Sequence, residues 1–287
     1  MRIAIVGLGG VGGYLAAMFA KSGCDVVGFA RGAHLEAIQK DGITIIEDAT
    51  EWRVPLHAMN LDAAEGYFDV VMFCVKSYDL DDAYAKMAKH IDKNSILLSF
   101  SNGVDNAKRL RTLSNAIVLE SCVYILAHIE KAGVIRKKGK VFAAVFGGDN
   151  TEAVQKVATL FEKAGLRYKT PDDITTAIWK KYIFIAAFAT LTSYYDTTIG
   201  AIYEEHYEEA KRLLEEIAVF AKEKEGVNID DEVQKALDTA SKVPYDSSTS
   251  MHLDFQNGKR VELESLSGYV KKPLMQKFYQ ELKGRKN

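Results

Sequence analysis

The chain contains little cysteine, proline and tryptophan, and its charges nearly balance. Its 287 residues include 3 cysteines, 4 prolines and 2 tryptophans, and the formal net charge is −2. There is no C-x-x-C pair and no cysteine–histidine cluster, so we expect no structural metal. Each cysteine lies in or beside an apolar run, which indicates small buried residues in a reducing compartment. The near-neutral charge gives no reason to expect nucleic acid or a membrane surface as a partner.

One candidate for a membrane span is the uncharged run over residues 182–195 in the helical half. It is shorter than the roughly 18–20 residues that span a bilayer, and it contains several polar groups. We interpret it as a buried core helix. The first apolar run ends after Val6 in glycines, so the N-terminus does not resemble a signal peptide. We therefore expect a cytoplasmic protein.

Residues 1–34 are the most informative segment, with the pattern strand, turn, helix and strand. An apolar strand over residues 3–6 leads directly into Gly7-Leu8-Gly9-Gly10-Val11-Gly12, which is the G-x-G-x-x-G fingerprint in its required setting. Gly7 permits the tight turn, Gly9 lets the backbone approach a pyrophosphate, and Gly12 lets the helix pack close to the strand. We expect these six residues to bind a dinucleotide at the helix N-terminus. The alternative is a glycine-rich turn without a ligand.

Arg31 indicates which dinucleotide would bind. An NAD site usually has Asp or Glu at the end of the second strand, about 20 residues past the glycines, to hold the ribose 2′-hydroxyl. This chain has Arg31 there. An acid would repel a 2′-phosphate, whereas a guanidinium pairs with it bidentately. We therefore expect NADP(H), the alternative being that Arg31 is a solvated loop residue.

Strands alternate with helices through residues 1–170, which predicts an α/β Rossmann domain with a doubly wound, mostly parallel sheet. The predicted strands are residues 3–6, 26–30, 43–46, 70–75, 96–100 and 117–126, and the predicted helices are residues 11–21, 34–39, 80–90, 104–110 and 151–164. A short hairpin is expected over residues 133–147. Residues 171–287 are expected to form an all-α second domain, with helices over residues 174–193, 204–224, 230–242, 249–255 and from 263 onward.

Two polar residues follow predicted strands, and ligands in such folds bind outside the carboxyl ends of the strands. Lys76 follows the strand at residues 70–75, and Asn102 follows the strand at residues 96–100. Both are therefore candidate site residues.

Three polar residues stand out in the helical half. Lys181 lies at the edge of a nearly all-apolar helix, where partial desolvation would lower its pKa and suit a proton donor. Glu262 is an acid between apolar residues, and Ser250 precedes it in the chain. Taken alone, none of the three is compelling, because they also fit the polar end of a buried helix, a surface charge and a helix cap.

Several segments together resemble the ketopantoate reductase (2-dehydropantoate 2-reductase) family. They occur in order over nearly the whole chain: GLGGVGGYLAAMFAKSGCDV, ARGAH, CVKSYD, SNGVDN, DDITTAIWKK and STSMHLDFQNGKRVELE. The resemblance implies a Rossmann domain followed by a helical domain, with the substrate in the cleft between them. It also implies reduction of ketopantoate to pantoate by NADPH in pantothenate biosynthesis.

The resemblance further implies a role for each candidate residue. The six turn residues would hold the NADPH pyrophosphate, Arg31 and Lys76 would serve the 2′-phosphate end, and Asn102 would lie near the nicotinamide ribose and the substrate. Lys181, in the Trp179-x-Lys181 motif, would polarise the C2 carbonyl of a 2-oxo acid and donate the proton. Glu262 would orient that lysine and bind in the substrate pocket, and Ser250 would hold the substrate carboxylate.

The chain departs from the family pattern beside the lysine. Asparagines that contact the substrate usually follow the lysine one and two turns along the same helix face, and this chain has Ile185 and Ala189 there. Because residues at these spacings share a face, the wall beside Lys181 is apolar. This favours a 2-oxo acid with a less polar tail, unless a hydroxyl further along compensates, from Thr190, Ser193 or Tyr194. A second departure is the short junction between Val270 and Pro273.

Other classes of protein remain as alternatives. One is a dehydrogenase of the β-hydroxyacid type, although residues 120–124 do not resemble the glycine-rich substrate loop of that family. Another is a non-catalytic NADP-binding sensor, against which the retention of Lys181 and Glu262 argues. The long helices of the second domain are candidates for a homodimer interface, although amphipathic stripes more often pack within one chain.

Overall fold

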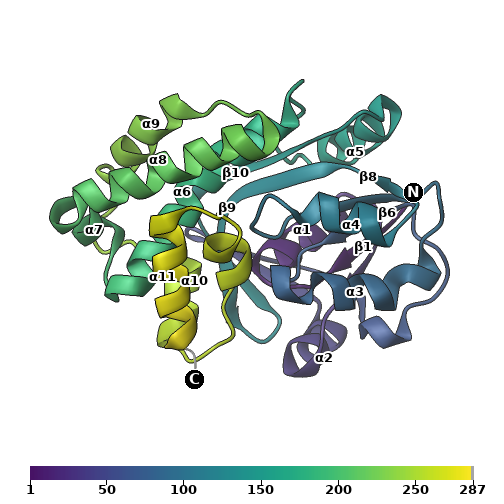
Figure 1. Ribbon diagram of the computed structural model, residues 1–287. Helices are drawn as coiled ribbons and strands as arrows, with labels where there is room; N and C mark the ends of the chain where they lie inside the picture. Colours follow the sequence, from purple (N-terminus) through teal and green to yellow (C-terminus); the bar gives the residue numbers. More distant parts are fainter. Residues whose placement is uncertain (286–287) are drawn as a thin grey trace. The chain divides into compact units, whose positions relative to one another are not determined.

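The computed structural model describes residues 1–285 and divides them into two compact units (Figure 1). Unit 1 contains Met1–Ser101 and Asp105–Ile174, and unit 2 contains Asn102–Val104 and the described residues from Thr175 onward. The division near Ile174 lies a few residues after the position expected from the sequence. The three residues Asn102–Val104 belong to unit 2, although both of their flanks belong to unit 1.

Sheet A of unit 1 is wholly parallel and has the strand order β5-β2-β1-β6-β7-β8. Its strands are β1 (Arg2–Val6), β2 (Asp25–Phe29), β5 (His57–Met59), β6 (Val70–Phe73), β7 (Ile96–Ser99) and β8 (Ile117–Val118). The helices of this region are α1 (Gly10–Lys21), α2 (Gly32–Asp41), α3 (Leu80–Met87) and α4 (Asn106–Leu113). The strand order reverses between β1 and β6, where doubly wound sheets bind their ligands.

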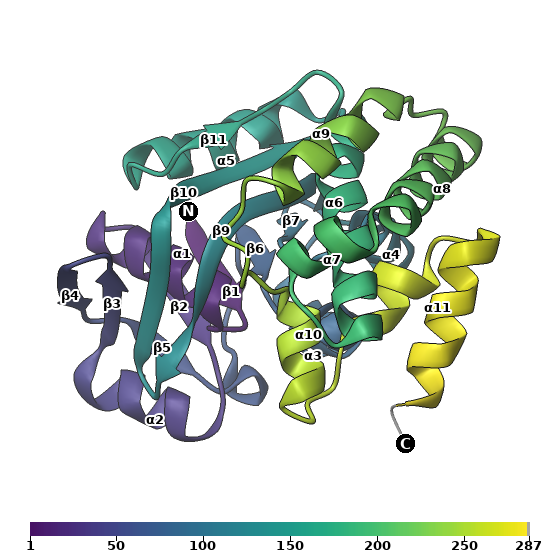
Figure 2. The ribbon, with the colours of Figure 1, turned by 90° about the vertical axis from the view of Figure 1, so that its left-hand side faces the viewer.

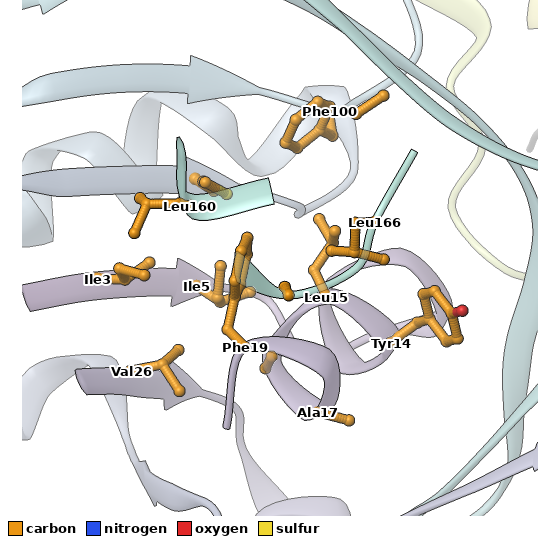
Figure 3. Packing of buried hydrophobic residues seen from close by; sticks show 14 of the residues in the cluster. Ile3, Ile5, Tyr14, Leu15, Ala17, Phe19, Val26, Phe100, Leu160 and Leu166 are labelled. Carbon is orange, nitrogen blue, oxygen red and sulfur yellow. The ribbon is translucent and has the colours of Figure 1, made fainter. Parts of the chain in front are cut away.

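The core of unit 1 comes from the apolar strands and the buried face of α1. All four residues of β6 are buried, as expected for a parallel strand covered on both faces. Phe19 of α1 is fully buried and lies next to Ile5 of β1 (Figure 3). The rings of Phe19 and Phe161 also meet edge to face, with their centroids 5.5 Å apart. Phe161 belongs to α5 (Thr151–Lys163). The predicted doubly wound fold is therefore confirmed.

A second sheet, sheet B, was missed. It contains β3 (Ile43–Glu47), β4 (Thr50–Val54), β9 (Glu120–Lys131), β10 (Val134–Gly147) and β11 (Tyr168–Lys169). The predicted short hairpin over residues 133–147 is wrong, because that range is one strand, β10, paired with β9 in a long hairpin (Figure 2). The strand predicted over residues 43–46 lies in sheet B rather than in the main sheet. Charged residues in the exposed end of β9 and in the exposed middle of β10, residues 138–141, conceal the apolar alternation there.

Unit 2 contains helices and no strand among its described residues. The helices are α6 (Ile174–Tyr195), α7 (Ile199–Glu205), α8 (Tyr207–Glu225), α9 (Asp230–Ala240), α10 (Ser250–Gln256) and α11 (Pro273–Gly284), with a π-helical turn at Glu264–Gly268. The helix predicted over residues 204–224 is two helices that meet at His206. The last predicted helix is divided into the π-helical turn and α11. The Glu216 carboxylate accepts the N–H groups of Leu274 and Met275, each at 3.0 Å, and so caps α11 just after the short junction.

Helix α6 forms the centre of the core of unit 2. It is the one described helix with the length and composition of a membrane span, and 61% of its apolar window is buried inside the protein. Its buried side chains pack in one cluster with those of α8, α9 and α11, which is the arrangement expected of a core helix. All three cysteines are free, as expected, but Cys24 and Cys74 are only partly buried.

Candidate cofactor and lysine sites

The turn between β1 and α1, residues Gly7 to Gly12, is here called the glycine turn. Gly7 has φ +97°, in the region that favours glycine. A Cβ there would also approach Val75 Cγ1 to 2.9 Å. The Phe29 carbonyl of β2 accepts the N–H groups of both Gly7 and Leu8, at 3.0 and 3.1 Å. The turn is therefore fixed to the neighbouring strand.

Gly12 and Gly9 have opposite surroundings. A Cβ on Gly12 would lie 2.0 Å from the Gly7 carbonyl oxygen, whereas a Cβ on Gly9 would meet nothing within 4 Å. Gly12 therefore permits close packing of α1 on the turn. Gly9 is the N-cap of α1 and supplies no side-chain cap, which leaves the helix start open to an anion. These features fit a dinucleotide pyrophosphate.

Packing against neighbouring strands also requires glycine at Gly10 and Gly13, positions that the G-x-G-x-x-G fingerprint leaves open. A Cβ on Gly10 would lie 2.1 Å from the Ala127 carbonyl oxygen of β9, and a Cβ on Gly13 would lie 2.7 Å from Ile135 Cγ1 of β10. The long hairpin therefore requires both positions to be glycine. The run of additional glycines was the only sequence signal, and it did not identify the partner.

Arg31 and Lys76 occupy loops that follow strands of sheet A. Arg31 is exposed and immediately precedes α2, which begins at Gly32. Lys76 is half-buried and precedes a short 3-10 turn, Ser77–Asp79. Arg109 of α4 was missed by sequence reasoning. Its guanidinium donates to the Ser77 carbonyl at 2.9 Å and to Asp81 Oδ1 at 2.8 Å, so it fastens the loop that carries Lys76.

His34 on α2 was also missed. Its Nε2 lies 2.9 Å from the Leu8 carbonyl oxygen of the glycine turn, and its Nδ1 lies 3.0 Å from the Gly133 amide nitrogen. Burial lowers the pKa of His34, and the hydrogen bond to Leu8 opposes that shift. The imidazole therefore joins three segments of unit 1.

In unit 2 the structure brings Lys181 and Asn102 together. Lys181 Nζ donates to Asn102 Oδ1 at 3.1 Å, and both side chains are half-buried. The two residues are 79 positions apart in the chain. The pair, called the lysine site below, places an ammonium group beside an amide at the edge of an apolar core.

Glu262 is 4% exposed, so it is not a surface charge. Its carbonyl accepts from Leu266 N at 3.1 Å, at the start of the π-helical turn. Tyr182, the residue after Lys181, donates from its hydroxyl to the carbonyls of Ser265 and Leu266 at 3.0 and 2.8 Å. These bonds fasten the segment that follows Glu262 to the part of α6 that carries Lys181.

Ser250 is the first residue of α10 and is exposed. The cap of that helix is its neighbour Thr249, whose hydroxyl accepts from His252 N and lies 2.9 Å from Thr192 Oγ1 of α6. His252, 3% exposed, bonds Asp196 at the end of α6 through Nε2 at 2.7 Å. The start of α10 is thus fastened to α6, and the interpretation of Ser250 as the cap is wrong.

The hydroxyls that could replace the missing asparagines are in different states. Thr190 Oγ1 donates to the Ala186 carbonyl at 2.7 Å and lies 2.7 Å from Ser267 Oγ. Tyr194 donates to Glu281 at 2.6 Å. Ser193 Oγ is buried without a hydrogen-bond partner among the described residues. Thr190 and Tyr194 are therefore engaged within the helical unit.

The doubly wound sheet with its glycine turn defines a class of protein, the dinucleotide-binding proteins of the Rossmann type. The family described as ketopantoate reductase PanE/ApbA matches residues 3–148, and its C-terminal counterpart matches residues 173–273. The chain belongs to the ketopantoate reductase family.

No group of three or more His, Cys, Asp or Glu residues that could hold a metal ion occurs in the part of the chain that the structure describes.

Individual relatives agree with this assignment. The chain is 31% identical to a 2-dehydropantoate 2-reductase of Mesorhizobium japonicum, over 94% of this chain and 90% of the relative. It is 29% identical to an uncharacterized oxidoreductase, YkpB, of Bacillus subtilis, over 94% and 91%. The crystal structure of a 2-dehydropantoate 2-reductase from Porphyromonas gingivalis superposes with a TM-score of 0.85 at 34% identity, covering 98% of this chain and 99% of that one.

Proposed function

We propose that this protein reduces 2-dehydropantoate (ketopantoate) to pantoate with NADPH, in the cytoplasm, as a step of pantothenate biosynthesis. The observation that carries the proposal is the Lys181–Asn102 hydrogen bond of 3.1 Å. It holds an ammonium group in a fixed position beside an apolar core. Such a group suits protonation of a carbonyl oxygen as negative charge develops on it.

The protein's own residues divide the work of the reaction. Bound NADPH supplies the hydride that reduces C2 of the 2-oxo acid. Lys181 polarises the C2 oxygen and donates one proton to it, which completes the hydroxyl of the product. Asn102 holds the ammonium in place, Glu262 orients the lysine, and Ser250 binds the substrate carboxylate.

The cofactor assignment rests on charge. Arg31 is exposed at the start of α2, where a guanidinium would pair with the 2′-phosphate of NADPH. Lys76 would add a second cation at the same end of the cofactor. The pyrophosphate would lie at the glycine turn and the N-terminus of α1.

A second candidate function is reduction of a 2-oxo acid with a less polar tail. Ile185 and Ala189 follow Lys181 on α6, and the Thr190 and Tyr194 hydroxyls are engaged within the protein. A buried hydroxyl without a partner costs about 1–3 kcal/mol, so the 4-hydroxyl of ketopantoate needs a partner such as Ser193.

The test is NADPH oxidation with ketopantoate, with its 4-deoxy analogue 3,3-dimethyl-2-oxobutanoate, and without substrate. Efficient turnover specific to ketopantoate supports the first function, and turnover of the deoxy acid alone supports the second. NADPH binding without turnover of either acid, or of a wider 2-oxo acid panel, would point to a sensor.

Lys181→Ala tests the chemistry. Loss of a general acid lowers kcat by about 100-fold to 10,000-fold, while NADPH affinity stays unchanged. The matched control is Lys180→Ala, because Lys180 is the adjacent lysine and pairs with Glu232 at 3.5 Å. Equal turnover in wild type and Lys181→Ala would contradict the assigned proton donor.

A further inference from the structure

Leu8, in the middle of the glycine turn, is held at three of its groups. Its N–H donates to the Phe29 carbonyl at 3.1 Å. Its side chain is buried against β2, where a Cβ on Gly28 would come within 2.8 Å of Leu8 Cδ1. Its carbonyl oxygen lies 2.9 Å from His34 Nε2. Of these three contacts, only the hydrogen bond to the Leu8 carbonyl comes from a side chain outside the sheet, that of His34.

The second bond of His34 determines the direction of the first. The Gly133 N–H donates to Nδ1 at 3.0 Å, so Nδ1 carries no proton and the neutral ring is protonated on Nε2. The Nε2–H therefore donates to the Leu8 carbonyl. Burial lowers the pKa of His34, which favours this neutral form.

The Leu8 carbonyl and the Gly9 N–H belong to one planar trans peptide and point in opposite directions. Because the carbonyl is held toward α2, the Gly9 N–H is directed away from α2. This N–H has no protein acceptor within residues 1–285. The side of Gly9 where a Cβ would stand is open as well.

Gly133, whose N–H donates to His34, is itself held in place. Gly133 lies in the turn between β9 and β10, and its carbonyl accepts from Thr44 N of β3 at 2.9 Å. A Cβ on Gly133 would approach Ala37 Cβ of α2 to 3.0 Å, so the end of the hairpin packs against α2 (Figure 2). The imidazole therefore links the glycine turn to sheet B through Gly133.

We infer that His34 is a positioning residue for the cofactor, which orients the Leu8–Gly9 peptide so that the Gly9 N–H donates to the pyrophosphate. The inference rests on the proposed cofactor site. The pyrophosphate is common to NADH and NADPH, so His34 contributes equally to the binding of both. Arg31, in contrast, contributes to NADPH alone.

The experiment measures Kd for NADPH and for NADH by nucleotide fluorescence, in the absence of substrate, with three variants of His34. His34→Ala removes both hydrogen bonds. His34→Gln keeps an N–H at the ε position that can reach Leu8, whereas His34→Asn keeps an acceptor at the δ position for Gly133 and has no N–H at the ε position. His57→Ala, an exposed histidine of β5, is the control.

We expect His34→Ala and His34→Asn to raise both Kd values about fivefold to tenfold, with the NADPH/NADH ratio unchanged. His34→Gln should bind as wild type does, and KM for the 2-oxo acid at saturating NADPH should not change in any variant. Melting temperatures identify variants that fail to fold, and the Gln/Asn pair then carries the test.

Three results with the variants would overturn the inference. One is unchanged binding in a folded His34→Ala. Another is weakening of NADPH alone. The third is rescue by Asn rather than by Gln. If the wild-type protein binds neither nucleotide, the proposed cofactor site is overturned as well. If the wild-type protein oxidises NADPH and His34→Ala leaves both Kd values unchanged, only this inference is overturned.

Discussion

The glycine turn of unit 1 and the lysine site of unit 2 are built from different parts of the polypeptide. The glycine turn offers backbone N–H groups, and its side chains are mostly absent, because at Gly7, Gly10 and Gly12 a Cβ would meet neighbouring atoms within 3 Å. The lysine site offers side chains that come from residues 79 positions apart. A backbone site is specified by steric exclusion over a short stretch, whereas a side-chain site is specified by tertiary bonds.

The largest difference is expected between two alanine substitutions in the glycine turn. Gly12→Ala would place a Cβ 2.0 Å from the Gly7 carbonyl oxygen, so we expect it to lower the free energy of unfolding by about 3 kcal/mol and to abolish nucleotide binding. Gly9→Ala meets no neighbour and should unfold as wild type does, with weaker nucleotide binding. Denaturant unfolding and nucleotide titration measure both. Equal loss of stability in the two variants would contradict the distinction.

Arg31→Ala removes a charge from the cofactor end of unit 1. A charge-assisted hydrogen bond contributes about 1.5–3 kcal/mol, so we expect Kd for NADPH to rise about 10-fold to 150-fold, with Kd for NADH unchanged. Lys40→Ala, at the other end of α2, is the control, because Lys40 is exposed on the same helix. An unaltered preference for NADPH would show that Arg31 is a solvated loop residue.

Tyr182→Phe tests whether the lysine site depends on tertiary bonds. The variant loses the hydroxyl that donates to the Ser265 and Leu266 carbonyls. We expect a loss of about 1–2 kcal/mol in the free energy of unfolding, a lower kcat, and an unchanged Kd for NADPH. Tyr245→Phe, with a half-exposed ring, is the control. Weaker NADPH binding together with an unchanged kcat would contradict this separation of the two sites.

The smallest expected effect is on the pH dependence of stability. Burial holds the pKa of His34 below its ordinary value of 6.5, so the unfolded chain takes up a proton at a pH where the folded protein does not. Stability from this group is therefore complete above about pH 6.5 and falls as the pH decreases. Melting temperatures of wild type and His34→Gln between about pH 8 and pH 5 measure it. A wild-type protein that loses no more stability than His34→Gln on acidification would contradict the assignment.

The comparison also explains how far the sequence predicted the structure. Local signals were sufficient for β1, β2, β6 and β7 of sheet A, for α1 and for the long core helix α6, because each shows its apolar period within a few residues. The edge strand β5, which has three residues, was missed. Sheet B was missed where the end of β9 and the middle of β10 are exposed and carry charge. The predicted helix over residues 204–224 joined α8 to the last residues of α7 and left out the rest of α7, since the break at His206 has no proline or glycine.

The sites divide in the same way. The glycine turn was predicted from a fingerprint, whereas the requirement for Gly10 and Gly13 depends on a hairpin more than 100 positions away. Lys181 and Glu262 stood out in the sequence, but only the family resemblance gave them roles, because their burial and partners are tertiary. His34 and Arg109 had no sequence signal, since the Gly133–His34 bond joins residues 99 positions apart.

The three-residue segment Asn102–Val104 has a consequence for modularity. It belongs to the helical unit, although the chain enters it from Ser101 and leaves it toward Asp105 of the other unit. A fragment that begins at Thr175 therefore carries Lys181 without the amide that accepts its hydrogen bond. The helical unit cannot be excised, permuted or grafted onto another dinucleotide-binding domain as one continuous cassette with its lysine site complete.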